Sequence, residues 1–403
     1  MRIALLSETY SKDMGYATSA LSKAFARLGA DVHLLVADLP PYYNLPDFAK
    51  TYGSFSGLKR EHAEVETIDG YTVHYLPHKK ILGYTRMTGL LEELRSLRPD
   101  VVQAMTAIGW IPLDAAVSRA LLDFSLFTET HTHASVFPLA KKKASLLDPE
   151  FLRNMLTRAA CGRLVSLFSE KCYGTAVDCA DVGVRFFGVQ RRKMALSPLG
   201  VDTSVFFPVR DASSERSRAE IRKKFGFSPS EVVCVYSGRF SEEKNPLLLA
   251  KAVARLRSSG QEVRGLFVGE GAQKEAIKAS DGCVVNPFVP FTDLGQYFRA
   301  ADIGAWPAQE SMSMLDCAAC GLPIVVNDTL QAVERVDGNG ATYKLHDAED
   351  LARVLASLLA APARERLGGH GAKKMAELYS WDTIARSRLR DYEAALARNR
   401  PRG

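Results

Sequence analysis

Short apolar runs alternate with amphipathic stretches along this chain, and this alternation limits the possible folds more than any other feature. Residues 3–6 form an apolar run typical of a buried strand, residues 18–28 have helical periodicity that ends at Gly29, and residues 32–36 give the next strand. A helix that joins two strands through such short connections makes a βαβ unit, which favours parallel strands and a right-handed crossover. The sequence therefore predicts an α/β fold.

The same pattern returns in the second half, where apolar strands are expected at residues 232–236, 265–268 and 303–306. A turn-rich passage at residues 197–203 and a charged stretch at 210–224 separate the two halves. With 403 residues, the chain is long for a single hydrophobic core. We predict an N-terminal domain over residues 1–205, a second domain over 206–382 and a C-terminal helical segment over 383–403.

The composition is that of a globular protein, with 47% hydrophobic and 24% charged residues. No apolar run approaches the ~20 residues needed to span a bilayer, and the first apolar run is too short for a signal peptide. The seven cysteines are odd in number and show no disulfide framework. We therefore expect a cytoplasmic protein.

Basic residues gather in four clusters before residue 200, although the net charge is only +6. The clusters lie at residues 59–60, 78–80, 141–143 and 191–193. They are either solvated surface or a means of attracting an anionic membrane or an anionic acceptor. Because no aromatic–basic stacking motif or zinc-ligand pattern accompanies them, we predict no nucleic-acid partner.

Several candidate site residues follow predicted strands directly. In open α/β sheets, ligands bind beyond the carboxyl ends of the strands, so two such domains are expected to enclose a cleft. This rule selects Gly15, His131, Arg239, Gly269 and Glu310. Gly15 has no side chain to block a ligand, although a simple turn is equally compatible with it.

The segment around Glu310 is rich in functional groups. Glu310 precedes a short turn, a helix is predicted to begin near Ser313, and Asp316 lies in its first turn. Unpaired N–H groups and the helix dipole at Ser313 favour a diphosphate, while Asp316 is placed to contact a ribose and Glu310 a hexose. The alternative is a capped helix with acidic residues near its N-terminus.

Arg239 and Lys244 lie between a predicted strand and the following helix. Two cations there would stabilise a departing diphosphate, unless they only pair with the neighbouring Glu242 and Glu243. The sequence contains no Asp-x-Asp motif and no cluster with metal-ligand spacing. We predict no metal and no cofactor.

His131 and His133 follow the predicted strand at residues 125–128. Either ring would be able to bond a sugar hydroxyl or an acceptor, and the alternative is a pair of partly buried loop histidines. His131 is closer to the end of the strand, so we favour it over His133 as the site histidine. His133, and Tyr16 next to Gly15, are possible acceptor or sugar contacts.

Taken in order, these segments resemble the family 4 glycosyltransferases, which are retaining nucleotide-sugar enzymes of the GT-B fold. The matching segments are Pro198-Leu199-Gly200-Val201-Asp202 with Phe206, Ser237-Gly238-Arg239-Phe240 to Lys244, Phe267-Val268-Gly269-Glu270-Gly271, Ala300-Ala301-Asp302-Ile303, and Tyr379-Ser380-Trp381-Asp382. The resemblance implies two Rossmann-like domains that face a central cleft, with the last helix crossing back to the N-terminal domain.

The resemblance also implies residue roles. Arg239 and Lys244 would hold the donor diphosphate, Glu310 the transferred sugar and Asp316 the ribose, and His131 would be the active-site histidine. Further expected donor contacts are Gly15, Gly269, Phe288, Val289, Ser311, Met312, Ser313 and Met314.

One departure from the family pattern concerns the acidic loop. The family usually has two glutamates separated by seven residues, whereas Glu310 and Asp316 are separated by five. Serines at 311 and 313 replace the usual glycines and would add hydroxyl groups near the phosphate or hexose.

The expected activity is a retaining, metal-independent transfer of sugar from a nucleoside diphosphate sugar to a hydroxyl acceptor, such as a glycan, a glycolipid or a small metabolite. Two alternatives remain open at this stage. One is a nucleotide-sugar epimerase or phosphorylase-like enzyme, and the other is a non-catalytic sugar-nucleotide-binding protein.

Overall fold

A computed structural model describes residues 1–11, 17–39, 64–141, 149–330 and 332–399. The chain divides into two compact units, with changes of unit after Leu199 and after Ser380. In the described part, the N-terminal unit comprises residues 1–39, 64–199 and 381–399, and the C-terminal unit comprises 200–380. The domain limits expected from the sequence, at residues 205 and 382, lie a few residues beyond these changes.

The N-terminal unit is built on an eight-stranded sheet in the order β10-β9-β8-β7-β1-β2-β4-β3. All neighbouring strands are parallel except β3 and β4. The strands are β1 (Arg2–Ser7), β2 (Asp31–Ala37), β3 (Val65–Ile68), β4 (Tyr71–Leu76), β7 (Val101–Ala104), β8 (Ser125–Thr130), β9 (Ser169–Gly174) and β10 (Met194–Leu196). β7 and β8 are buried along their whole length, as expected for central strands of a parallel sheet.

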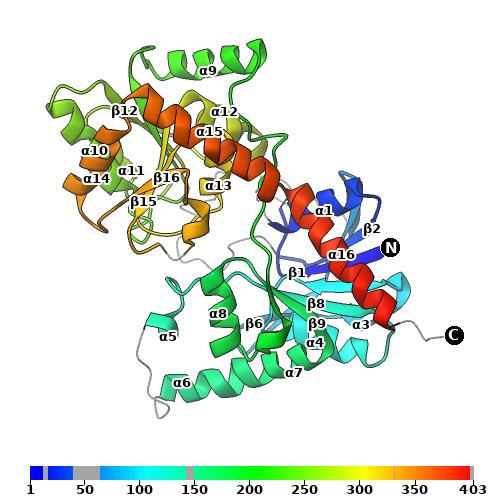
Figure 1. The fold of residues 1–403 in the computed structure, drawn as a ribbon. Coiled ribbons are helices and arrows are strands. Elements are labelled where there is room, and N and C mark those ends of the chain that lie inside the picture. Colours follow the sequence, from blue (N-terminus) through cyan, green and yellow to red (C-terminus); the bar gives the residue numbers. More distant parts are fainter. Residues whose placement is uncertain (12–16, 40–63, 142–148, 331, 400–403) are drawn as a thin grey trace. The chain divides into compact units, whose positions relative to one another are not determined.

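A hairpin and several helices complete this unit (Figure 1). The hairpin consists of β5 (His78–Ile81) and β6 (Tyr84–Met87). The helices are α1 (Ala17–Arg27), α3 (Leu90–Leu97), α4 (Trp110–Arg119), α5 (Pro138–Lys141), α6 (Pro149–Asn154), α7 (Ala160–Phe168) and α8 (Val177–Phe186), with a 3₁₀ turn at Arg191–Lys193. A π-helical turn, η2 (Met155–Ala159), joins α6 to α7 without a break.

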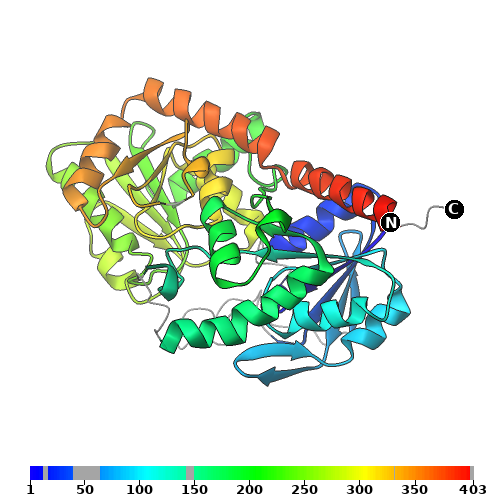
Figure 2. The same cartoon turned by 60° about the horizontal axis from the view of Figure 1, so that its bottom comes forward.

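The last helix, α16 (Trp381–Asn399), belongs to the N-terminal unit. It packs against α1 and β8, and both views of the ribbon show it lying along α1 (Figures 1 and 2). Its buried face includes Ile384, Ala385 and Tyr392, at the spacing that a helix requires to cover one surface.

The C-terminal unit contains a six-stranded parallel sheet in the order β13-β12-β11-β14-β15-β16. Its strands are β11 (Val232–Ser237), β12 (Val263–Val268), β13 (Cys283–Asn286), β14 (Ile303–Trp306), β15 (Ile324–Asn327) and β16 (Gly340–Tyr343). Its helices are α9 (Ala212–Lys224), α10 (Pro246–Ser258), α11 (Lys274–Lys278), α12 (Phe291–Ala300), α13 (Ser313–Ala319), α14 (Ala348–Ser357) and α15 (Ala361–Leu378), with a 3₁₀ turn at Val333–Arg335. Two units with parallel sheets confirm the predicted α/β class.

The strand orders place a topological switch point in each sheet. In the C-terminal unit, the chain builds outward from β11 in one direction and from β14 in the other. In the N-terminal unit, the corresponding neighbours are β1 and β7. Ligands of open α/β sheets bind at such points.

None of the helices among the described residues is both long enough and apolar enough to cross a bilayer.

Candidate functional site

The loops that follow β11 and β14 meet at the switch point of the C-terminal sheet. Arg239 and Lys244 lie between β11 and α10, and Glu310 lies between β14 and α13. Because β11 and β14 are paired neighbours, both loops leave the same edge of the sheet side by side. The structure thus brings together three of the residues that the sequence selected.

Lys244 connects these two loops directly. Its Nζ donates a hydrogen bond to the backbone oxygen of Glu310 at 2.7 Å. Burial and the nearby charge of Arg239 lower the pKa of Lys244 to about 8, although the charge of Glu310 partly opposes this shift. An anion bound beside Lys244 would relieve the unfavourable environment of its charge.

Arg239 is half-buried, and its backbone oxygen accepts a hydrogen bond from the Tyr236 hydroxyl at 3.0 Å. Its guanidinium makes no hydrogen bond or ion pair with the part of the chain that the structure describes. Glu242 and Glu243 are exposed, and neither forms an ion pair with Arg239 or Lys244 within that part. The structure therefore does not show the alternative in which Arg239 and Lys244 form ion pairs with Glu242 and Glu243.

The loop after β14 is held through its carbonyl groups. Asn327 Nδ2, at the end of β15, donates to the Ala308 oxygen at 2.7 Å. Tyr343 of β16 donates its hydroxyl to the Pro307 oxygen. These contacts fix the backbone just before Glu310, whose own side chain is only 9% exposed.

Helix α13 begins at Ser313, as predicted. The Ser313 hydroxyl donates to the Ser237 oxygen at the end of β11 at 3.2 Å and lies 2.7 Å from the Ser311 hydroxyl. Met312 occupies the N-cap position without a side-chain cap. Met312 is half-buried, whereas the Met314 side chain is 1% exposed and belongs to the core.

Asp316, in the first turn of α13, is 5% exposed. Burial, with a smaller contribution from the neighbouring Asp202, raises the pKa of its carboxyl well above the ordinary value. Its carboxyl accepts no hydrogen bond from any residue that the structure describes. Asp202 lies 114 positions earlier in the chain, and no sequence signal predicted that it would approach Asp316.

Gly269 brings the loop after β12 against the loop after β11. Its φ is +154°, and a Cβ atom at this position would lie 1.9 Å from the Gly238 oxygen. Only glycine allows this approach. Phe288 and Val289, which follow β13 farther along the same edge, are half-buried.

His131 follows β8 in the N-terminal unit and is tied to a buried ion pair. Its Nε2 lies 3.2 Å from Glu129 Oε1, and Arg388 Nη1 of α16 lies 2.6 Å from Glu129 Oε2. Burial opposes the charge of Glu129, but Arg388 and His131 together outweigh burial and lower the pKa of this carboxyl. Gln103 of β7 also donates to Glu129 at 3.0 Å.

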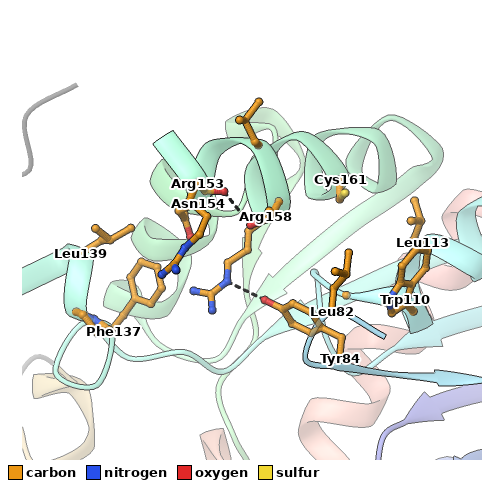
Figure 3. A pocket seen from close by; sticks show the side chains of 14 residues that line it. Leu82, Tyr84, Trp110, Leu113, Phe137, Leu139, Arg153, Asn154, Arg158 and Cys161 are labelled. Carbon is orange, nitrogen blue, oxygen red and sulfur yellow. Dashed lines mark hydrogen bonds between the residues drawn. The ribbon is translucent and has the colours of Figure 1, made fainter. Parts of the chain in front are cut away.

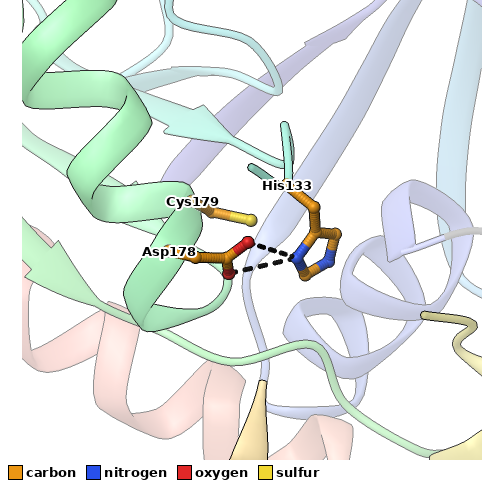
Figure 4. Close-up of side chains that lie close together, drawn as sticks. All are labelled: His133, Asp178 and Cys179. Carbon is orange, nitrogen blue, oxygen red and sulfur yellow. Dashed lines mark hydrogen bonds and ion pairs between the residues drawn. The ribbon is translucent and has the colours of Figure 1, made fainter. Parts of the chain in front are cut away.

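His133 has a different partner (Figure 4). Its Nδ1 lies 3.1 and 3.0 Å from the two carboxylate oxygens of Asp178, which also accepts a hydrogen bond from the Ala134 N–H at 2.9 Å. Cys179 lies close by, and one potential ligand atom from each of these three side chains lies within 4.8 Å of the others. The hydrogen bonds of Asp178 account for the arrangement without an ion. The side chain of His133 is 14% exposed, compared with 36% for His131.

Gly15 and Tyr16, which the sequence selected as donor and acceptor contacts, lie outside the described residues. Sequence reasoning also missed the polar network from α16. Arg388 and Tyr392 lie four residues apart on one face of that helix, and this spacing of polar groups among apolar ones was the available signal.

Residues 231–361 match the family model described as glycosyl transferases group 1. A D-inositol 3-phosphate glycosyltransferase from Segniliparus rotundus is 28% identical over 305 residues, covering 72% of this chain and 64% of that relative. The match thus spans slightly less than two thirds of that relative's own length.

Solved structures share the fold over nearly the whole chain. Sucrose-phosphate synthase from Thermosynechococcus elongatus has a TM-score of 0.71 at 16% identity, covering 99% of this chain and 100% of its own. HepE from Anabaena, solved in complex with UDP-glucose, has a TM-score of 0.67 at 16% identity, covering 98% and 100%. These findings confirm the predicted family resemblance and the GT-B fold.

Proposed function

We propose that this chain transfers a sugar from a nucleoside diphosphate sugar to a hydroxyl acceptor. The premises are the match of residues 231–361 to the glycosyl transferases group 1 model and the GT-B fold of the chain. The proposal includes retention of configuration and a reaction that needs no metal ion. One observation carries it: Arg239 and Lys244, which form no ion pair with any described residue, lie at the switch point of the C-terminal sheet, where a phosphorylated ligand is expected.

In the proposed mechanism, Arg239 and Lys244 bind the diphosphate of the donor. When the bond between the sugar and the diphosphate breaks, negative charge accumulates on the leaving oxygen, and cations that are already in place stabilise it without rearrangement. A diphosphate oxygen then accepts the proton of the acceptor hydroxyl as this attacks from the same face of the sugar. The N–H groups at Ser313 are proposed to assist, although α13 is short.

The two acidic residues have separate proposed roles. Glu310, held beside Lys244 through its backbone, contacts the hydroxyl groups of the transferred sugar. Asp316 contacts the ribose, and the raised pKa of its buried carboxyl favours a neutral group that both donates and accepts hydrogen bonds. Gly269, Phe288 and Val289 line the part of the edge proposed for the base.

The N-terminal unit is proposed to bind the acceptor. His131 follows β8 at the carboxyl edge of its sheet, and Glu129 and Arg388 fix the orientation of its ring. An oriented imidazole is well suited to bond a hydroxyl group. The name of the relative, D-inositol 3-phosphate glycosyltransferase, supports a hydroxyl-bearing acceptor for this chain.

Contact with an anionic membrane surface belongs to the same proposal. Two of the basic clusters have exposed residues on the N-terminal unit, namely residues 78–80 in one cluster and Arg191 and Arg192 in the other. Lys193 is not available for this role, because its Nζ donates to backbone oxygens of Ser166, Leu167 and Ser169 at the end of α7. The clusters at residues 59–60 and 141–143 have no described side chains.

The proposal is tested by measuring release of nucleoside diphosphate from a panel of UDP-, GDP- and ADP-sugars. We expect acceptor-dependent release by the parent protein and a loss of about 100-fold or more in Arg239→Ala and Glu310→Ala, since removing one preorganised contact to the transition state typically has this effect. Arg255→Ala is the matched control, because Arg255 is exposed on α10 and, among the described residues, forms an ion pair only with the exposed Glu349.

A parent no more active than Arg239→Ala would contradict the proposal and favour the non-catalytic alternative. Formation of an epimerised donor without transfer would instead favour the epimerase alternative. No observation in the structure supports either of these over transfer.

A further inference from the structure

The N-terminal unit contains a cavity of about 650 Å³ that the proposed mechanism does not use. It is enclosed by the β5–β6 hairpin, the start of α4, the segment after β8 and the helical run from α6 to α7 (Figure 3). Its volume falls in the usual range of small-molecule sites, roughly 300–1,000 Å³. All of its described lining residues belong to the N-terminal unit.

Most of the cavity wall is apolar. Leu113, Phe137, Leu139 and Leu156 line it from three separate segments. Leu156 is 74% exposed, so the cavity opens to solvent at the helical run. No aspartate or glutamate is among the described lining residues. An apolar chain or ring therefore fits this wall better than a polar sugar does.

Arg158 supplies a positive charge inside this apolar wall. Its Nε donates to the Tyr84 hydroxyl at 2.7 Å, and its guanidinium lies 5.7 Å from the centre of the Phe137 ring. Both partners are neutral, and within the described chain Arg158 forms no ion pair. The side chain is thus oriented while the terminal nitrogens of its guanidinium stay unused by described residues.

Arg86, another arginine of the N-terminal unit, differs from Arg158 in having an acidic partner. Arg86 of β6 binds Asp114 through two hydrogen bonds of 2.8 and 2.9 Å, so its charge is already satisfied. A guanidinium presents two parallel N–H groups that match the oxygens of a carboxylate or phosphate. Because Arg158 pairs with no described carboxylate of the chain, these N–H groups remain available for an anionic ligand.

Arg158 also lies in the π-helical turn Met155–Ala159. Single π turns inside helices are uncommon and frequently occur at functional sites, because they change the direction in which side chains point. Arg153, one turn earlier, lines the same cavity and is exposed. Arg153, in α6, thus gives the cavity a second cation near solvent.

We propose that this cavity binds an amphiphilic acceptor, with Arg158 holding its carboxylate or phosphate and the apolar wall holding the adjacent hydrocarbon. The assignment of the occupant as acceptor rests on the proposed transferase function. The location supports it: Phe137 follows β8 and Gly109 follows β7, so the cavity lies toward the strand edge that also carries His131.

Cys161 provides a direct test, because its half-buried free thiol lines the cavity. Its alkylation by N-ethylmaleimide is measured by mass spectrometry in the presence of decyl phosphate, decanoate or neutral decyl glucoside, each below its micelle concentration. Cys283 in the C-terminal unit is also half-buried and serves as the internal control.

We expect an anionic probe to slow the alkylation of Cys161 in a saturable manner, at least about fivefold, while Cys283 is unaffected. Whichever anionic probe protects at the lower concentration identifies the head group as phosphate or carboxylate. Arg158→Leu should raise the concentration needed for protection by about tenfold or more, since a charge-assisted bidentate contact is lost. Arg163→Leu is the matched control, because Arg163 is exposed on α7 outside the cavity.

Arg158→Lys keeps the charge without the fork of donors and covers the case in which the leucine variant does not fold. Protection by neither anionic probe, equal protection by decyl glucoside, or unchanged protection in a folded Arg158 variant would overturn the proposal. Failure of the transferase function would appear separately, as a lack of nucleoside diphosphate release, because protection of Cys161 requires no donor.

Discussion

Replacing Lys244 by methionine is expected to separate the stability of the C-terminal unit from its ability to bind a donor. In the unliganded protein, the charged form of Lys244 is disfavoured by burial and by Arg239, which lower its pKa from 10.5 to about 8. Methionine fills similar space without charge. Without ligand, the variant should therefore have a higher free energy of unfolding than the parent. It should also bind a nucleoside diphosphate with lower affinity.

The magnitude follows from the pKa of Lys244. A shift of this size corresponds to about 2–3 kcal/mol of destabilisation after allowance for the partly exposed side chain. Loss of the hydrogen bond to the Glu310 oxygen removes about 1 kcal/mol, so the net gain of the variant below pH 8 is about 1–2 kcal/mol. Between pH 8 and pH 10.5, Lys244 binds more protons in the unfolded chain than in the folded one. The stability of the parent therefore rises with pH in this range, and the stability difference between variant and parent decreases.

Thermal unfolding between pH 7 and pH 10.5 measures this difference, at about 2–4 °C per kcal/mol for a unit of this size. Calorimetric titration with nucleoside diphosphate should show affinity reduced about 10- to 150-fold, as expected when a charged hydrogen bond worth about 1.5–3 kcal/mol is lost. Lys251→Met, on the exposed face of α10, is the matched control and should change neither result. A stability difference that stays constant with pH, or an unchanged affinity, would refute the reasoning.

Three further substitutions test other parts of the molecule. Arg388→Leu should lower the free energy of unfolding by about 3–5 kcal/mol, because it leaves Glu129 buried without the Arg388 cation. A double variant that also carries Glu129→Leu should regain most of this stability, as measured by thermal melting. Asp316→Asn should preserve or raise the melting temperature at pH 7, since burial already raises the pKa of this carboxyl, while it weakens nucleotide binding in calorimetry; unchanged affinity would exclude a ribose contact. Gly269→Ala should destabilise the C-terminal unit by about 3 kcal/mol or more, because the added Cβ would clash with the Gly238 oxygen, and an unaltered melting curve would contradict that close packing.

The elements that hold the candidate donor site could be predicted from the sequence because their signals are local. Strands β11, β12 and β14 lie within one or two residues of the expected ranges, since each is a short apolar run bounded by polar or turn residues. The start of α13 at Ser313 was also predicted correctly, from the change to small residues with helical spacing. Position after a strand then sufficed to select Arg239 and Glu310.

The contacts that orient these residues could not be predicted in the same way. The ion pair between Glu129 and Arg388 joins residues 259 positions apart, and hydrophobic periodicity shows that a helix is buried without identifying its polar partner. The π turn at Met155–Ala159 has no periodic signal of its own, because one extra residue per turn is hidden within an otherwise helical pattern. The cavity beside it could therefore be recognised only in the folded structure.

The backbone contacts of the loop after β14 explain how a loop shorter than the family pattern keeps Glu310 in place. Lys244, Asn327 and Tyr343 hold the loop by donating to carbonyl oxygens, which are present whatever the side chains are. These anchors lie at the start of the loop, so they do not depend on the length of its far end, which leads into α13. Because the anchor from Lys244 is on Glu310 itself, removing this lysine is expected to take away the proposed phosphate contact and also to release the carboxylate proposed for the sugar. The effects of substituting Lys244 and Glu310 on donor binding are consequently coupled, as expected for residues in direct contact, and do not measure two independent contributions.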